Sequence, residues 1–115
     1  MTSTKHFDAE TENAARLFLS RLSRQYTIAS ALLFGSRARG SSRSDSDTDI
    51  AVVLRGDHGR RVEEALKMAD IAFDVMLETG VLVEAIPLWE SEWEHPETFN
   101  NPALIENIRR EGLRL

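Results

Sequence analysis

The segment DIAVVL, residues 49–54, restricts the fold of this chain more than any other part of the sequence. A strand with one face in water alternates apolar and polar residues, whereas a strand buried on both faces is apolar almost throughout. Every residue after Asp49 in this segment is apolar. We therefore expect residues 49–54 to form a strand in the centre of a sheet.

Two further strands are predicted, one on each side of this segment in the sequence. Residues 28–34 form a short apolar run that stops at Gly35, a residue that commonly ends a strand. Residues 81–88 form a third apolar run, in which Pro87 indicates either the end of the strand or a position at the edge of the sheet. The polar chain after Gly35 leaves room for about two helical turns and a turn before the central strand.

Apolar residues at helical spacing predict three longer helices. The first spans residues 8–25, and the second spans residues 59–79 and ends at Gly80. The third begins with Pro102, which suits the first position of a helix, and ends before Gly112. We expect the inner face of the second helix to be formed by Val62, Leu66, Ala69, Phe73 and Leu77.

The order of these elements predicts the fold class. Helices that follow strands in turn are typical of an α/β (α+β) domain, with a small mixed sheet flanked by helices. A chain of 115 residues supports one hydrophobic core, so we expect a single domain over residues 1–115. Residues 89–100 show no regular pattern and are predicted to be an irregular connector. Their large apolar side chains, Trp89, Trp93 and Phe99, either cover the edge of the core or anchor a partner.

Several classes of protein are excluded by composition. The chain has no cysteine, which excludes a disulfide framework and a thiolate metal site. No apolar run approaches the roughly 20 residues of a membrane span, and the polar start MTSTKHFDAE lacks the apolar core of a signal peptide. We therefore expect a cytoplasmic protein without a membrane segment.

The charge distribution argues against nucleic acid as the partner. The formal net charge is -5, whereas proteins that bind nucleic acid are normally basic. A local basic patch on an acidic chain fits a small anionic ligand better, although a solvated surface has the same composition. The patch consists of Arg37, Arg39, Arg43, Arg55, Arg60 and Arg61.

Three aspartates, Asp45, Asp47 and Asp49, alternate directly before the central strand. Residues two apart at the start of a strand point to the same face, so we expect the side chains of Asp47 and Asp49 to lie together. Two carboxylates on one face suit a hard divalent cation such as Mg²⁺, whose other ligands are phosphate oxygens and water. Upstream, Gly35 lets the backbone approach a ligand closely, and free N–H groups after Ser36 favour a phosphate. This combination indicates a site for transfer at a phosphoryl centre.

A simple solvated loop is the ordinary alternative to a metal site at these aspartates. The other functional interpretations of this segment have less support from the sequence. A calcium-binding EF-hand needs glycine at its sixth position and glutamate at its twelfth, where this chain has Ile50 and Gly56. Ser36 lacks the G-x-S-x-G context of a hydrolytic nucleophile. The histidines share no ligand spacing, so we expect them to face solvent or cap helices. They are His6, His58 and His95.

The same residues resemble the signature of a known family. Gly35 and Ser36, ten intervening residues, then Asp47-x-Asp49 and an apolar strand resemble the polymerase-β-like nucleotidyltransferase superfamily. The form GSRARG...SDSDTDI is most similar to its smallest branch, the minimal nucleotidyltransferase (MNT) domains. The order of elements agrees over roughly residues 10–112. The resemblance implies a polymerase-β-like nucleotidyltransferase core.

The resemblance also implies an activity and the residues that carry it. Family members transfer a nucleoside monophosphate from a nucleoside triphosphate to an acceptor hydroxyl, with Mg²⁺ bound in a two-metal site. On this chain, Asp47 and Asp49 would hold the metals, while Gly35 and Ser36 would hold the β- and γ-phosphates. Arg37 and Arg39 lie within the phosphate-loop motif and would add positive charge there. Asp45 lies outside the signature spacing, and we assign it to the turn or to a supporting role.

The family usually adds a third carboxylate from a later strand. Glu84 is the candidate, because it lies within the predicted third strand. Asp70 and Asp74 are rivals, but their surroundings predict a helix. A glutamate reaches further than the commoner aspartate, and a solvated Glu84 with no role in catalysis is the alternative.

The resemblance finally implies a partner. Small MNT proteins often accompany a helical HEPN partner in toxin–antitoxin systems, where the MNT protein neutralises a ribonuclease. The leading hypothesis is therefore an antitoxin that transfers AMP from ATP to a hydroxyl on a HEPN-type protein, within a homo- or hetero-oligomer. One alternative is a binding module of the same fold that masks its partner without turnover. Another is a nucleotidyltransferase that acts on a small molecule such as an antibiotic.

Overall fold

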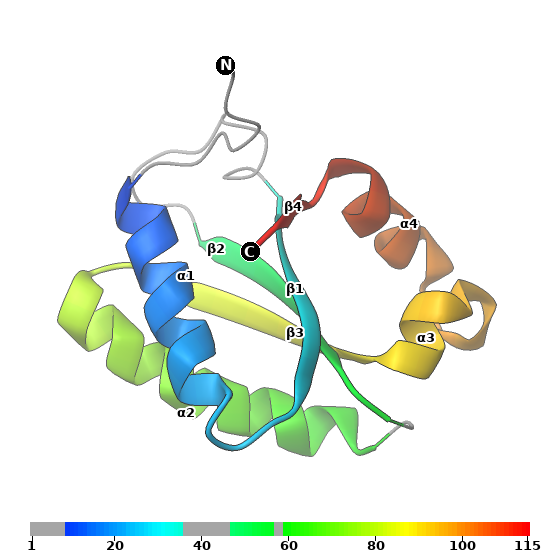
Figure 1. The fold of residues 1–115 in the computed structure, drawn as a ribbon, viewed down its shortest axis with the longest axis horizontal. Helices are drawn as coiled ribbons and strands as arrows, with labels where there is room; N and C mark the ends of the chain where they lie inside the picture. The colour runs from blue at the N-terminus through cyan, green and yellow to red at the C-terminus, as the bar shows by residue number, and fades with distance from the viewer. Residues whose placement is uncertain (1–8, 36–46, 57–58) are drawn as a thin grey trace.

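A computed structural model of the chain describes residues 9–35, 47–56 and 59–115. These residues form a four-stranded mixed sheet with helices on both faces (Figure 1), which confirms the predicted α+β architecture. In chain order the elements are α1 (Ala9–Leu22), β1 (Ile28–Phe34), β2 (Thr48–Leu54), α2 (Arg61–Thr79), β3 (Val83–Trp89), α3 (Glu90–Glu94), the 3-10 helix η1 (Pro96–Thr98), α4 (Pro102–Glu111) and β4 (Leu113–Arg114). The strand order is β3-β2-β1-β4, so β2 lies inside the sheet, as its sequence predicts.

The strand pairings explain where each strand end lies. Strand β2 pairs antiparallel with β1 and parallel with β3, because α2 carries the chain back to the end of the sheet at which β2 begins. The edge position of β3 agrees with Pro87, which cannot donate a ladder hydrogen bond. Strand β4 pairs antiparallel with β1 at Leu32 and Leu33. It was not predicted, since two residues carry no periodic signal.

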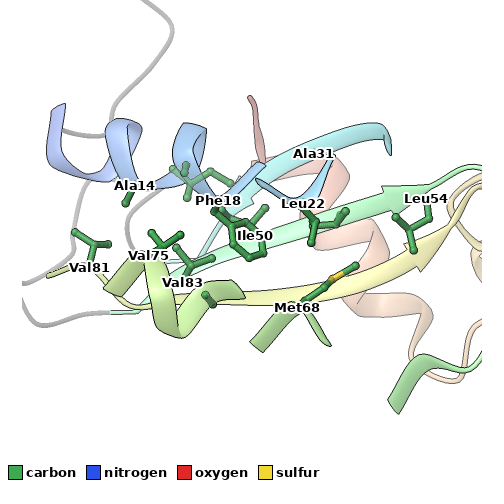
Figure 2. Close-up of a cluster of buried hydrophobic side chains, with 14 of the residues drawn as sticks. Ala14, Phe18, Leu22, Ala31, Ile50, Leu54, Met68, Val75, Val81 and Val83 are labelled. Carbon is green, nitrogen blue, oxygen red and sulfur yellow. The ribbon is translucent and has the colours of Figure 1, made fainter. Parts of the chain in front are cut away.

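The sheet separates two hydrophobic clusters. One lies between the sheet and helices α1 and α2 and takes Ile50, Val52 and Leu54 from β2 (Figure 2). The other lies on the opposite face with α4 and takes Ala51 and Val53. Side chains alternate along a strand, so β2 is buried on both faces.

The prediction of which face of α2 is buried is wrong. The exposed fractions are 73% for Val62, 64% for Leu66, 53% for Phe73 and 67% for Leu77, and Ala69 is exposed as well. Periodicity identifies residues that share a helix face, but it does not decide which of two apolar faces meets the sheet. The residues that α2 buries are Met68, Ala72 and Val75.

Residues 89–100 are more regular than expected, because they form α3 and η1. Trp89 and Phe99 are buried and cover the core. The guanidinium of Arg61, at the start of α2, lies 5.2 Å from the ring centroid of Trp89 and 4.8 Å from that of Phe99. It also pairs with the buried carboxylate of Glu92 in α3. A cation thus ties α2 to a segment whose sequence shows no helical periodicity.

The predicted ends of the later helices are confirmed. Gly80 adopts a left-handed conformation at the end of α2, and its N–H donates to the carbonyl of Met76 at 2.7 Å. Helix α4 begins at Pro102 and is followed by Gly112. The short helix expected after Gly35 lies outside the described residues. Within the described part of the chain, no helix combines the length and the apolar character that crossing a membrane requires.

Candidate functional site

Asp47 and Asp49 lie at the start of the central strand. Asp47 directly precedes β2, and Asp49 is the second residue of the strand. Side chains two apart on a strand share a face, so both carboxylates lie on the face that carries Ala51 and Val53. Both aspartates are half-buried. The start of β2 therefore presents two carboxylates on the face opposite to α1 and α2.

Glu84 completes a cluster of three carboxylates. The parallel register of β2 and β3 makes Glu84 the direct neighbour of Asp49. Partial burial raises the pKa of Glu84 above its ordinary value, as do the charge of Asp47, a side-chain hydrogen bond with Asp47 and the charge of Asp49. Glu84 itself is exposed, whereas Asp47 and Asp49 are half-buried. Negative charge is therefore concentrated at this end of the sheet.

The rival carboxylates do not reach this cluster. Asp70 and Asp74 are exposed on α2. Helix α2 packs on the face of the sheet that carries Ile50 and Val52, whereas Asp49 projects to the other face. The structure therefore brings Glu84, and neither Asp70 nor Asp74, beside Asp49.

Gly35 directly follows β1 and lies against the side chain of Asp49. The register partner of Asp49 on β1 is Phe34, the residue before Gly35. Gly35 has a φ of +79°, which side-chain-bearing residues rarely adopt, and a Cβ atom at this position would collide with Oδ2 of Asp49. Only glycine leaves room for both the turn and the carboxylate.

A recess of about 250 Å³ opens beside Gly35, between the end of β1 and α4. It is lined by Phe34, Gly35, Leu104, Asn107, Ile108 and Glu111. Both apolar and polar side chains line it, and it adjoins the glycine that contacts Asp49. It offers room for a small ligand next to the carboxylate cluster.

The other predicted phosphate ligands, Ser36, Arg37 and Arg39, lie outside the described residues. So does Asp45, which was assigned to the turn or to a supporting role. Of the basic patch, the three described arginines each form a salt bridge with a glutamate. The pairs are Arg55 with Glu90 at 3.8 Å, Arg60 with Glu63 at 3.1 Å, and Arg61 with Glu92. Each of these three arginines therefore already has a carboxylate partner.

Thr48, between the two aspartates in the sequence, is a buried polar residue that the sequence analysis did not single out, and its side chain points to the face of the sheet opposite to theirs. Its N–H donates to the carbonyl of Leu82 at 2.8 Å, which holds the start of β2 against the chain that leads into β3. Its side chain is fully buried, and Oγ1 has no hydrogen-bond partner in the described part of the chain. Threonine is common in strands, so no sequence pattern distinguishes this one.

The donor chemistry of the cluster fits a hard divalent cation. Carboxylate oxygens are the ligands that Mg²⁺ prefers, and a cation would offset the repulsion among Asp47, Asp49 and Glu84. As they stand, the described residues hold no group of three or more Asp, Glu or His side chains arranged around one metal position. The charges of Asp47 and Asp49 both raise the pKa of Glu84, so a cation among the three carboxylates would relieve that repulsion.

The sequence of this region matches a known domain. A profile of the nucleotidyltransferase domain matches residues 15–114, which include all three carboxylates and Gly35. The chain belongs to this family. Among curated proteins, no significant match to this nucleotidyltransferase-family chain is found.

Two solved structures share the fold of this nucleotidyltransferase domain. One is a protein from Sulfolobus solfataricus described as a candidate nucleotidyltransferase, with 20% identity and a TM-score of 0.53, covering 93% of this chain and 86% of that one. The other is described as a toxin–antitoxin with AMP-PNP, with 19% identity and a TM-score of 0.60, covering 90% of this chain and 70% of that one. At these identities the likeness concerns the fold alone.

Proposed function

We propose that this nucleotidyltransferase transfers AMP from ATP to a hydroxyl group on a partner protein, with Mg²⁺ as its metal. The observation that carries the proposal is the cluster of Asp47, Asp49 and Glu84 beside Gly35. A concentration of carboxylates next to a backbone turn suits a metal–triphosphate complex, because the metal neutralises both the carboxylates and the phosphates.

Each residue of the cluster has a proposed role. Asp47 and Asp49 would hold Mg²⁺ in a two-metal site, where the bound metal would supply positive charge to offset that of the phosphates. Glu84 helps to hold a metal or accepts the proton of the attacking hydroxyl. The backbone at Gly35 and Ser36 binds the β- and γ-phosphates.

The proposed reaction is a displacement at phosphorus. The acceptor oxygen attacks the α-phosphorus of ATP, the bond from that phosphorus to the bridging oxygen breaks, and pyrophosphate leaves. The proton of the hydroxyl passes to the carboxylate of Glu84 or to water. Arg37 and Arg39 contribute positive charge for the departing pyrophosphate.

The partner is proposed to be a HEPN-type helical toxin, with this chain as its cytoplasmic antitoxin. The toxin–antitoxin structure of similar fold contains AMP-PNP, an analogue of ATP. Its assembly with a second protein and its nucleotide support both a protein acceptor and an adenine nucleotide.

The mass of the partner tests this proposal. A small helical protein encoded beside this chain is incubated with the chain, ATP and Mg²⁺, and its mass should increase by one adenylyl group or a small multiple. Asp49→Asn should abolish the increase and leave partner binding intact, since it removes metal charge rather than surface contacts. If no increase occurs and the Asp49→Asn protein still neutralises the partner, neutralisation is by masking and the enzymatic proposal is wrong.

A further inference from the structure

An apolar stripe runs along the outer face of α2, and we call it the outer stripe. It consists of Val62, Leu66, Ala69, Phe73 and Leu77, all exposed. At about 100° per residue these side chains fall within an arc of about 80°. The first four are spaced four, three and four residues apart, the spacing of a coiled-coil seam. Monomeric proteins rarely expose a continuous apolar surface of this kind, so the outer stripe is a candidate binding surface.

Acidic residues border the outer stripe on one side only. On that side lie Glu63, Asp70, Asp74 and Glu78, with the one cation Lys67 among them, by the same helical geometry. This is the side that faces α1, because Glu78 pairs with Arg21 of α1 at 2.5 Å. The other side carries the uncharged, half-buried Ala65 and Met76. A molecule that covers the stripe therefore meets negative charge along one of its two borders.

Two of these carboxylates are not neutralised within the described part of the chain. Asp70 and Asp74 form no salt bridge with any described residue. The cation nearest to them in sequence, Lys67, lies 3.9 Å from Glu64 and is paired with it. Positive groups on a binding partner would complement Asp70 and Asp74, whereas negative groups would be repelled.

The outer stripe and the carboxylate cluster share one end of the sheet, although they lie on opposite sides of it. Helix α2 ends at the same end of the sheet at which β2 and β3 begin (Figure 1). Leu82, which is 40% exposed, follows this end and accepts the backbone hydrogen bond of Thr48. Thr48 lies between Asp47 and Asp49. A protein whose helix lies along the stripe would reach the carboxylates by passing around this end of the sheet.

We propose that the outer stripe docks an amphipathic helix of the partner protein, with apolar residues at coiled-coil spacing and Lys or Arg along one border. The inference rests on the proposed function, in that the docked protein is the one whose hydroxyl accepts the nucleotide. Two properties of α2 define this partner: the seam spacing calls for a helix, and Asp70 with Asp74 calls for basic residues.

A second copy of this chain fits the surface less well. A twofold axis that pairs two α2 helices antiparallel places their acidic borders on the same side, so that like charges meet. A twofold axis that pairs them parallel places Asp70 and Asp74 opposite Ala65 and Met76, which offer no positive charge. Neither arrangement satisfies the acidic border, and juxtaposed like charges disfavour association.

Two designed peptides test the proposal on the full chain. Both are helical heptad repeats with leucine at the seam positions; one has lysine along both borders of the seam and the other has glutamate. Repulsion among the border charges keeps each peptide from pairing with itself. Fluorescence anisotropy should show that the lysine peptide binds about tenfold tighter or more than the glutamate peptide.

Variants assign the binding to the outer stripe. The double variant Leu66→Ser with Phe73→Ser should weaken binding of the lysine peptide about tenfold or more. Asp70→Asn with Asp74→Asn should reduce the preference for lysine over glutamate. The matched control removes two acids elsewhere, Glu94→Gln with Glu106→Gln, and should leave the preference unchanged. All substituted side chains are exposed, so circular dichroism should show an intact fold for each variant.

Three results would overturn the proposal. One is equal binding of the two peptides, or binding that survives the Leu66→Ser and Phe73→Ser substitutions. Another is dimerisation in sedimentation equilibrium that the double variant abolishes, which would assign the stripe to a second copy. The third is flotation with phosphatidylcholine vesicles that depends on the stripe, which would assign it to a membrane surface. The docking proposal expects the Asp49→Asn protein to bind the lysine peptide as wild type does, whereas the proposed function expects it to lose nucleotide transfer. Loss of transfer with peptide binding retained, or the reverse, therefore shows which of the two proposals has failed.

Discussion

Asp49 and Glu84 are direct neighbours across the parallel pairing of β2 and β3. This relationship makes a glutamate far along the sequence part of the same cluster as the two aspartates. We expect Glu84→Gln to lower the rate of the proposed AMP transfer about a hundredfold or more, because a neutral amide can neither accept a proton nor offer a charged ligand. The rate is measured by partner labelling, with a parallel thermal melt to show that the variant folds. Unchanged labelling would assign Glu84 to the solvated surface.

The raised pKa of Glu84 predicts how stability depends on pH. The folded protein holds this proton more tightly than the unfolded chain does, which stabilises the fold below the ordinary pKa of 4.5. That stabilisation is lost as pH rises through the raised pKa. At about pH 7, Glu84→Gln should therefore melt slightly higher than wild type, and the difference should vanish below about pH 4.

The control for this pH dependence is Glu94→Gln, at an exposed glutamate in α3 beyond the far end of β3. Its melting temperature should differ from wild type by a similar small amount at both pH values. A Glu84→Gln protein that is less stable than wild type at neutral pH would contradict the repulsion within the cluster.

The two aspartates are expected to cost stability when no cation is bound. Replacing Asp47 and Asp49 by Asn removes their mutual repulsion, so the melting temperature without ligand should stay the same or rise slightly. Wild type should gain stability from Mg²⁺ with ATP, and the double variant should not. Differential scanning fluorimetry with and without EDTA measures both effects. A double variant that fails to fold would mean that the pair is structural.

Alanine substitutions at two glycines with the same backbone conformation distinguish the cost of the left-handed backbone from the effect of a Cβ atom that crowds Asp49. Gly35 and Gly80 have φ values of +79° and +78°, but a Cβ atom meets Asp49 at position 35 and open space at position 80. Alanine at either position should cost about 1–2 kcal/mol for the left-handed backbone. Gly35→Ala should in addition displace Asp49 and lose the stabilisation by Mg²⁺ with ATP, whereas Gly80→Ala should keep it. Equal responses to ligand would remove Gly35 from the proposed site.

Two threonines test the buried hydroxyl beside the aspartates. Thr48 Oγ1 has no hydrogen-bond partner in the described part of the chain, whereas Thr79 Oγ1 donates to the carbonyl of Val75 at 2.8 Å and accepts from the N–H of Val81 at 3.1 Å. Thr48→Val should raise the free energy of unfolding by about 1 kcal/mol, because it removes an unsatisfied buried group. Thr79→Val should lower it by a similar amount. Urea denaturation measures both, and a destabilised Thr48→Val would mean that the hydroxyl has a partner in the folded protein.

The sequence was sufficient for the local elements and for the placement of the two aspartates on one face of a strand. The apolar run in β2, the glycine after α2 and the proline at the start of α4 act on neighbouring residues, so their effects can be predicted without the rest of the chain. The same holds for Asp47 and Asp49, since residues two apart on one strand share a face. Glu84 is different: its place beside Asp49 depends on the register of two strands joined by a long helix, which no local pattern specifies.

Helix α2 shows where the sequence alone was insufficient. Its periodicity correctly predicted a helix ending at Gly80 and correctly grouped Val62, Leu66, Phe73 and Leu77 on one face. It did not predict that this face points to solvent, because a second face, with Met68, Ala72 and Val75, also suits a core. Burial depends on which face fits the surfaces of β2, β3 and α1 once the chain has folded, and that is a property of tertiary packing rather than of helical spacing.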